Sequence, residues 1–306
     1  MISNLDAKSK RTVIQDFTGV YAKQPFMQEL RSVADNGSPP HNINGADIHW
    51  LDCTQIAGTD CYCDDEAVKA IRGQIADAGI TDAHGIHFID GGNYHYMSKI
   101  WTDMVQEPFS LVVFDHHPDM QAPRFGGILS CGGWVLEVLK SNPFVQSVTL
   151  IGVADHLVDE IRQEISQTGN AHVLDKVLFI KESELSSVTL DSIPYRLSAS
   201  RVQNDNSASV TLKGAFRRSI GPMDSIYISI DKDALAPAYA ATNWDQGSLD
   251  VANLKKIIAG LASSHKILGI DICGERARDI EDSRADALNS ELNRELAEFL
   301  APFAAS

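Results

Sequence analysis

Three features that the sequence lacks narrow the class of protein. No apolar run approaches the ~20 residues that a membrane-spanning helix needs. The first segment, MISNLDAKSKRTVIQDF, has no apolar stretch behind its basic residues, as a secretory signal would have. Basic residues are also few: the chain has 26 Lys and Arg and 41 Asp and Glu, which gives a formal net charge of −15. Nucleic-acid binders concentrate Lys and Arg, so we expect a cytoplasmic protein that binds neither nucleic acid nor membranes.

Cysteine is sparse as well. The sequence has an odd number, five, spread over 306 residues: Cys53, Cys61, Cys63, Cys131 and Cys273. A chain of this length does not depend on disulfide bonds, so reduced thiols are expected. The Cys61-Tyr-Cys63 segment lacks a second Cys or His pair at the spacing of a zinc site, which argues against structural zinc.

What is present is a regular alternation of two kinds of segment. Apolar residues make up 44% of the chain, which is ample for a core. Short β-branched runs alternate with segments of helical period, including helices expected over residues 64–79 and 248–265 with a Ser cap for the second. The expected strands are residues 12–17, 46–51, 85–90, 110–115, 147–153, 176–180, 225–231 and 267–273.

Several of these strands are apolar on both faces, which is typical of a sheet covered on both sides. The alternation predicts an α/β fold, a single three-layer α/β/α domain over residues 1–306 with a doubly wound, mostly parallel sheet. One stretch, residues 196–224, is too long and polar for an ordinary connection. It could be a surface excursion, a lid or an oligomer contact.

Polar residues follow several of the expected strands directly. SLVVF is followed by Asp115-His-His117-Pro-Asp119, and SIYISI by Asp231-Lys-Asp233. In open α/β sheets, ligands bind outside the carboxyl ends of the strands. Residues two apart on an extended backbone point the same way, so each set of side chains is expected to converge.

Four carboxylates in one cleft would repel one another unless a cation holds them. Carboxylate and imidazole ligands together suit two divalent ions such as Mn²⁺, bridged by shared aspartates. An isolated D-x-D segment is weak evidence, because it is often a turn or a helix cap. Two such sets behind two apolar strands favour the metal interpretation, whereas alternation points His116 away from the others.

These motifs resemble those of the arginase, agmatinase and formiminoglutamase family of Mn²⁺-dependent ureohydrolases. The family carries G-G-D-H, D-A-H-x-D and S-x-D-x-D-x-x-D-P segments, of which the second and third correspond to DHHPD (115–119) and SIDKDALAP (229–237). The resemblance covers residues 85 to 275 and implies an arginase-like fold, two Mn²⁺ ions per chain and a homo-oligomer, either a trimer or a hexamer.

The resemblance also implies roles for individual residues. Asp115 and Asp231 would bridge the two ions. Asp119 would complete the shell of the first ion, and His117 with Asp233 that of the second. Hydroxide held between the ions would attack the guanidino or amidino carbon of a small arginine-, agmatine- or guanidino-acid-like substrate. The products would be an amine and urea or a related amide.

The first motif is imperfect. GGNYH (91–95) matches G-G-D-H without a gap only if Tyr94 takes the position of the metal-binding histidine. His95 becomes the imidazole ligand of the first ion if the loop carries one extra residue. Both registers remain open from the sequence.

Three further departures concern catalysis. Cys131 stands where the family has a histidine associated with proton shuttling, although a thiol is a poor base near neutral pH. Gly274 stands where a substrate-holding glutamate is expected, and Glu275 follows one residue late. Ala236 replaces the last Asp of the third segment. The candidate catalytic residues are Asp119, Glu275 and Cys131.

Candidate substrate contacts follow the same strands. The set is Gln121, Asp155, Trp244, Asp245 and Glu275, of which Trp244 and Asp245 belong to the ATNWDQGSLD segment (241–250). Each has an ordinary alternative: a surface polar residue for Gln121 and Asp155, a turn for Trp244 and Asp245, and a salt bridge to Arg276 or Arg278 for Glu275.

Two other functions remain open. Deacetylases of related architecture use one Zn²⁺ held by an Asp-x-His pair and a later Asp. A ureohydrolase-like protein that has lost turnover through the changes at Cys131 and Gly274 could instead serve as a metal-binding, non-catalytic subunit.

Overall fold

The computed structural model describes residues 10–36, 46–185, 225–276 and 281–305. The polar stretch at residues 196–224 lies outside the described residues. No helix in the described ranges has both the length and the apolar character needed to cross a bilayer.

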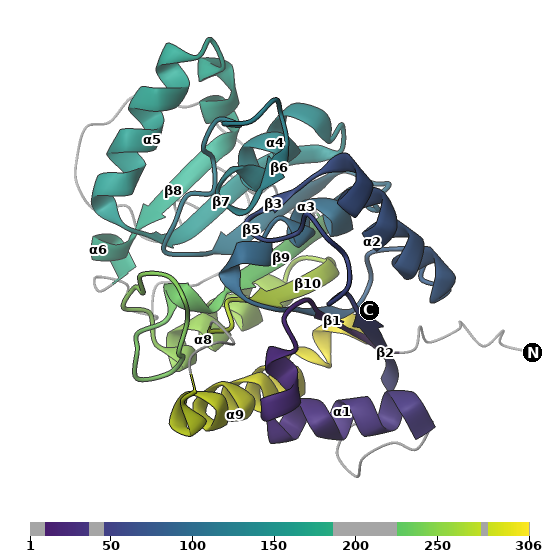
Figure 1. Ribbon diagram of the computed structural model, residues 1–306. Helices are drawn as coiled ribbons and strands as arrows, with labels where there is room; N and C mark the ends of the chain where they lie inside the picture. The colour runs from purple at the N-terminus through teal and green to yellow at the C-terminus, as the bar shows by residue number, and fades with distance from the viewer. Residues whose placement is uncertain (1–9, 37–45, 186–224, 277–280, 306) are drawn as a thin grey trace, which may run out of the picture.

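Eight parallel strands form one sheet in the order β2-β1-β4-β10-β9-β5-β7-β8 (Figure 1). Their bounds are β1 Lys10–Asp16, β2 Ala46–Asp52, β4 Ile86–Ile89, β5 Phe109–Phe114, β7 Val145–Val153, β8 Val177–Lys181, β9 Ser225–Asp231 and β10 Ile267–Cys273. All eight strands predicted from apolar runs are confirmed, with differences only at their ends.

The central strands bury both faces. In β5, Leu111 and Val113 join one hydrophobic core, whereas Val112 and Phe114 join a second core on the opposite face. Alternation along the strand therefore sends successive apolar side chains into different layers.

Helices cover both faces of the sheet (Figure 1). The first core takes side chains from α2 Asp65–Asp77, α3 Met97–Thr102, α4 Trp134–Ser141 and α5 Asp155–Gln167. The second takes them from α1 Pro25–Asn36, α8 Val251–Ala262 and α9 Ser283–Leu300. The remaining short segments are α6 Glu182–Leu185 and the 3-10 turns η1 Val20–Lys23, η2 Gly92–Tyr94, η3 Cys131–Gly133, η4 Ala171–Lys176, η6 Lys232–Ala234 and η7 Phe303–Ala305. The expected three-layer, doubly wound α/β fold is confirmed.

Both expected helices are present, as α2 and α8. The Asp64 carboxylate accepts from the Ala67 backbone N–H at 2.8 Å and caps α2. For α8 the Ser cap is wrong: Asp250 caps the helix and accepts from Asn253 N–H at 2.7 Å. Leu249 is paired with Leu235 by a β-bridge, which keeps the chain before Asp250 extended and non-helical.

A second, two-stranded sheet was not expected from the sequence. β3 (Tyr62–Cys63) pairs antiparallel with β6 (Leu129–Ser130), with Tyr62 opposite Ser130 and Cys63 opposite Leu129. Strands of two residues are too short to show an alternating pattern. This small sheet holds the segment before α2 against the segment before α4.

A buried ion pair joins the ends of β9 and β10 to α9. The Lys232 ammonium donates to the Glu275 carboxylate and, at 3.2 Å, to Asn293 Oδ1. The same carboxylate accepts from Gln24, Asn289 and Asn293 at 2.7 to 2.8 Å. Burial by itself raises the pKa of Glu275, but Lys232 and these amides outweigh it and lower the pKa.

We predict that Lys232→Met strongly destabilises the protein, because it leaves the Glu275 charge buried without its partner. The expected loss is about 3–5 kcal/mol of unfolding free energy. Lys266→Met breaks an exposed ion pair with Glu107 and should cost about 1 kcal/mol or less. Urea unfolding of the chelator-treated proteins measures both, and equal small losses would contradict the prediction.

Candidate metal centre and its pocket

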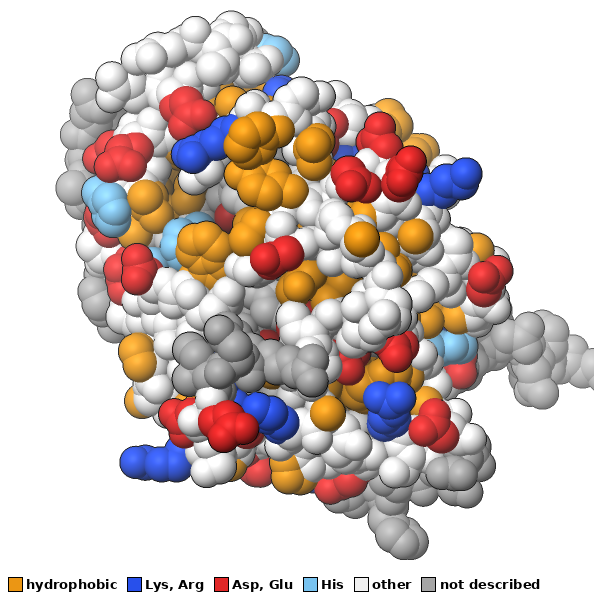
Figure 2. Space-filling model, viewed as in Figure 1, with side chains coloured by type: hydrophobic (Ala, Val, Ile, Leu, Met, Phe, Trp, Pro, Cys, Tyr) orange, Lys and Arg blue, Asp and Glu red, His pale blue; other side chains and the backbone are white. Residues whose placement is uncertain are grey.

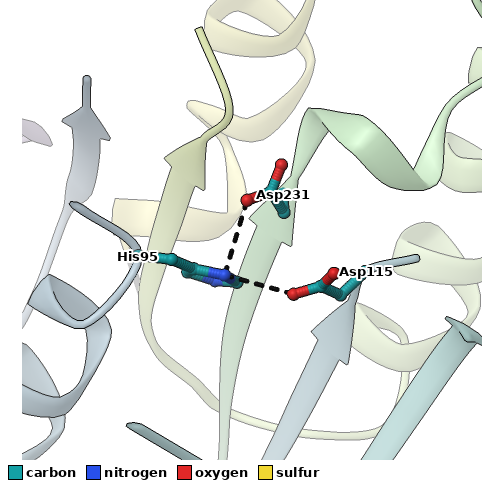
Figure 3. Close-up of side chains that lie close together, drawn as sticks. All are labelled: His95, Asp115 and Asp231. Carbon is teal, nitrogen blue, oxygen red and sulfur yellow. Dashed lines mark ion pairs between the residues drawn. The ribbon is translucent and has the colours of Figure 1, made fainter. Parts of the chain in front are cut away.

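Three neighbouring elements deliver the first group of candidate ligands to the carboxyl edge of the sheet (Figure 3). His95 follows the η2 turn after β4, Asp115 follows β5 directly, and Asp231 is the last residue of β9. One ligand atom from each lies within 4.8 Å of the others, and all three side chains are buried. The strand order places β5 and β9 side by side, so their terminal carboxylates meet.

The η2 turn determines which residue of the first motif, Tyr94 or His95, faces the carboxylates. His95 Nδ1 lies 3.1 Å from Asp115 Oδ2, 3.0 Å from Asp119 Oδ2 and 3.5 Å from Asp231 Oδ2. The ring of Tyr94 stacks on Phe17 instead, with ring centroids 4.4 Å apart. The 3-10 turn accommodates the extra residue, so His95 is the residue that faces the carboxylates.

A second group shares Asp115 with the first. His117 Nδ1 lies 2.9 Å from Asp233 Oδ2 and 3.5 Å from Asp115 Oδ1, and the ligand atoms of these three residues again lie within 4.8 Å of one another. Asp233 belongs to the η6 turn, and its backbone N–H donates to Asp231 Oδ1 at 2.9 Å. Asp115 therefore lies between two sets of candidate metal ligands.

Asp119 joins this centre, but not as a residue of an extended strand. β5 ends at Phe114, and Asp119 has a φ of 46°, in the left-handed region. The expectation that alternation along an extended backbone aligns Asp115, His117 and Asp119 is wrong, because the chain turns after Asp115. The Asp119 carboxylate is fixed by Trp134 Nε1–H, which donates to Oδ2 at 2.8 Å.

Hydrogen bonds beyond the carboxylates orient the His95 ring. Its Nε2 lies 2.9 Å from Ser229 Oγ, which lies 2.9 Å from Ser98 Oγ. Both serines are fully buried. This contact holds the other ring nitrogen, Nδ1, toward the carboxylates, as partners of metal-binding histidines commonly do.

The buried carboxylates of this centre repel one another. Burial, and then repulsion from Asp233, raise the pKa of Asp231 to about 8. Burial and Asp115 likewise raise the pKa of Asp233 to about 6. Burial alone would lower the pKa of His117, but hydrogen bonds to Asp115 and Asp233 outweigh it and raise the pKa to about 12. The carboxylates thus lack sufficient positive charge nearby.

The residues fit divalent metal ions. Asp115 Oδ2 is buried and accepts no hydrogen bond from the described residues, so it is an available ligand atom. Carboxylate oxygens with one imidazole in each group suit hard to borderline divalent ions. A cation in each group would also offset the repulsion among the aspartates.

The centre forms the floor of a cavity of about 430 Å³. Asp115, His117, Asp119, Asp231 and Asp233 all line it. His117 is 24% exposed whereas His95 is 1% exposed, so the second group lies nearer to solvent. On the face viewed in Figure 2, hydrophobic side chains lie interspersed with acidic and basic ones.

Four of the predicted catalytic or substrate-binding residues line this cavity, namely Asp119, Gln121, Cys131 and Trp244. The Trp244 ring lies 5.8 Å from the His117 ring and donates its N–H to Asn93 at 2.9 Å. Burial and the nearby Asp119 raise the pKa of Cys131, so its thiol stays protonated at neutral pH. That protonation state does not suit the expected proton-shuttling role.

The other predicted contacts lie elsewhere in the described chain. Asp245 is exposed and does not line the cavity. Asp155 accepts from the Ser183 hydroxyl at 2.6 Å at the start of α5, also outside the cavity. Asp155 matches its ordinary interpretation as a surface polar residue, whereas Asp245, for which the ordinary interpretation was a turn, is simply exposed.

Glu275 is the clearest correction. Its carboxylate is turned away from the cavity and is held by Lys232 and three side-chain amides. Gly274 has a φ of 93°, and a Cβ there would lie 2.2 Å from Asp231 Oδ1. No larger residue fits at 274, so the chain has no glutamate at that position to face the substrate. The alternative salt bridge to Arg276 is wrong too, since Arg276 pairs with Asp286. Arg278, the other partner considered, lies outside the described residues.

Sequence reasoning missed one wall of the cavity. A single face of α5 contributes Leu157, Glu160, Ile161 and Glu164. Their spacing of i, i+3, i+4 and i+7 marks one side of a helix. The sequence signal that could have revealed this wall is the pair of carboxylates, Glu160 and Glu164, on a helix face that is otherwise apolar. Arg124, Cys61 and Tyr62 also line the cavity without having been predicted as site residues.

Comparison of the sequence with known proteins gives little functional information. No family model matches the chain. An uncharacterized protein from Thermotoga maritima is 26% identical over 263 residues, which cover 86% of this chain and 78% of that protein.

Comparison of the structure is more informative. Proclavaminate amidino hydrolase from Streptomyces clavuligerus superposes with a TM-score of 0.61 at 15% identity, covering 97% of this chain and 92% of the other. Arginase from Medicago truncatula gives 0.57 at 15% identity, covering 95% and 86%. A triple mutant of a T. brucei arginase-like protein bound with Mn²⁺ gives 0.58 at 18% identity, covering 99% and 93%. The chain therefore has the arginase-like fold of the ureohydrolases, as its motifs predicted.

Proposed function

We propose that this protein is a metal-dependent hydrolase that binds two divalent ions, Mn²⁺ by preference, and cleaves a C–N bond of a small guanidino or amidino compound. The observation that carries the proposal is the pair of ligand groups that share Asp115 on the floor of one cavity. The Mn²⁺-bound T. brucei arginase-like variant, which has a similar fold, supports the choice of metal.

Two ions are favoured over one because each group has its own imidazole and its own carboxylates. Asp115 would hold both ions, with His95, Asp119 and Asp231 on the first and His117 and Asp233 on the second. Asp231, which the resemblance made a second bridging ligand, is thus assigned to one ion only. A single-zinc enzyme would leave one of these buried groups without compensating charge.

The protein's own residues would bind and orient the substrate. Bound divalent ions supply an activated water for hydrolysis near neutral pH. The reacting carbon would approach from the His117 side, which is the more exposed part of the centre. Trp244 and Tyr62, both lining the cavity, would form walls that restrict the space around the substrate.

The α5 wall supports a cationic substrate with an aliphatic part. Glu160 and Glu164 offer negative charge, and Leu157 and Ile161 offer apolar surface between them. Guanidinium and amidinium groups are planar cations that pair well with carboxylates. These residues would take the place of the glutamate that position 274 cannot carry.

The ligand assignment predicts how many ions each variant binds. His95→Ala and Asp233→Asn should each lose about one of the two ions, whereas Asp115→Asn should lose both. Asp77→Asn, at an exposed residue of α2, is the matched control and should keep both. Elemental analysis after dialysis against Mn²⁺ measures this. Full retention by Asp115→Asn would contradict the assignment.

Hydrolysis itself is tested with the Mn²⁺-loaded protein. We expect release of urea or an amine from at least one of arginine, agmatine, guanidinobutyrate, N-hydroxyarginine, formiminoglutamate and guanidine. Asp233→Asn should reduce kcat by about 100-fold or more, because it removes a ligand of one ion. Bound metal without turnover on the whole panel would favour a non-catalytic role. One zinc per chain with amide hydrolysis would favour the deacetylase-like alternative.

The proposed role of the α5 wall predicts a binding defect. Glu160→Gln should raise KM for a cationic substrate about tenfold or more, because a charge-assisted hydrogen bond is lost. Its metal content should be unchanged. Asp159→Asn changes the neighbouring residue, which pairs with Lys181 instead of lining the cavity, and should leave KM unchanged. Equal kinetics for the two variants would remove Glu160 from the binding site.

A further inference from the structure

Two cysteines lie opposite each other at the end of the small β3–β6 sheet. Tyr62 pairs with Ser130 and Cys63 with Leu129, so the same antiparallel register places Cys61 opposite Cys131. The Cys131 backbone N–H donates to the Cys61 carbonyl at 2.9 Å. Each thiol also lies close enough to affect the pKa of the other. Two residues 70 apart in the sequence therefore lie side by side.

Their backbone geometry suits a disulfide bond. Directly opposed residues of antiparallel strands have Cα atoms about 4.5–5.5 Å apart. Cys61 and Cys131 continue the β3–β6 register by one residue, with Cys61 at a φ of 58° just before β3. Disulfide bonds join cysteines whose Cα atoms are about 4.4–6.8 Å apart. Closing the bond would thus require adjustment of the side chains rather than of the strands.

The other three cysteines are committed to buried contacts. Cys63 is 1% exposed and its thiol contacts Tyr96. Cys53 donates to Gln74 at 3.2 Å, and Cys273 donates to the Gly91 carbonyl at 3.2 Å. In contrast, Cys61 and Cys131 are partly exposed and both line the cavity above the metal centre. A small reagent that enters the cavity can reach this pair.

We propose that Cys61 and Cys131 form an oxidisable thiol pair, a site of reversible modification by low-molecular-weight disulfides. One protein thiolate attacks a sulfur of the small disulfide, which forms a mixed disulfide and releases one small thiol. The second protein thiolate then attacks the protein sulfur of the mixed disulfide and releases the other small thiol. Two protein thiols are oxidised, one small disulfide is reduced to two thiols, and the two protons pass to the released thiolates.

The cross-link would act on the wall of the cavity. Cys131 begins the η3 turn, and Gly132 in that turn accepts from Gln121 N–H at 2.8 Å. Val135, one turn further on, donates its N–H to the Asp119 carbonyl at 3.0 Å. A bond from Cys131 to Cys61 therefore ties the segment that contacts Gln121 and Asp119 covalently to the segment before α2.

Burial raises the pKa of both thiols, and neighbouring acids, Asp60 for Cys61 and Asp119 for Cys131, raise it further. Attack requires the thiolate, so the exchange is best followed in mildly alkaline buffer.

The test uses the full-length, reduced protein incubated under native conditions with oxidised glutathione. We expect the number of free thiols to fall from five to about three, with loss of two hydrogens in the intact mass and no bound glutathione. Peptide mapping should join Cys61 to Cys131, and dithiothreitol should restore all five thiols. Five unreacted thiols, a stable glutathione adduct or a disulfide between other cysteines would overturn the proposal.

Variants separate this pair from general thiol chemistry. Cys61→Ser and Cys131→Ser should each stop at a glutathione adduct on the remaining cysteine, because no second thiol resolves it. Cys53→Ser is the matched control and should form the disulfide as the wild type does. Circular dichroism checks that each variant is folded. The readouts are masses and thiol counts, so they do not depend on bound metal or on the proposed hydrolysis.

Discussion

The arrangement of the site depends on one constraint, the mutual repulsion of carboxylates that are buried close together. Asp115, Asp231 and Asp233 converge at the ends of two adjacent strands, and each is almost completely buried. His95 and His117 contact them, but the raised pKa values of Asp231 and Asp233 indicate that this charge is not sufficient. A protein keeps such a cluster in its interior only when a further cation compensates it.

The fold explains why the cluster forms where it does. Parallel strands in a three-layer α/β architecture place their carboxyl ends at one edge, where loops rather than helices decide the chemistry. Two turns then set the details: η2 brings His95 rather than Tyr94 to the carboxylates, and the left-handed residue Asp119 returns its side chain to the centre. A second buried pair, Lys232 with Glu275, anchors the adjoining backbone to α9.

The sequence predicted the strands and the principal ligands because both leave local patterns. Apolar runs mark all eight strands, and Asp115 and Asp231 fall at strand ends by simple counting. The destination of Glu275 was not predictable in this way, since it depends on Lys232 and on amides from α9 and Gln24, far away in the sequence. The α5 wall and the two-residue strands β3 and β6 were missed for related reasons. The role of the α5 wall and the pairing of β3 with β6 depend on segments that are far apart in the sequence, so no local pattern reveals them.

The central claim is that two metal ions lie on either side of Asp115. A crystal structure of the Mn²⁺-loaded protein, with anomalous scattering data collected at the manganese edge, tests it most directly. We predict two anomalous peaks about 3.5–4 Å apart, one contacted by His95 and the other by His117, with the Asp115 carboxylate between them. A single peak, or no peak next to Asp115, would contradict this account.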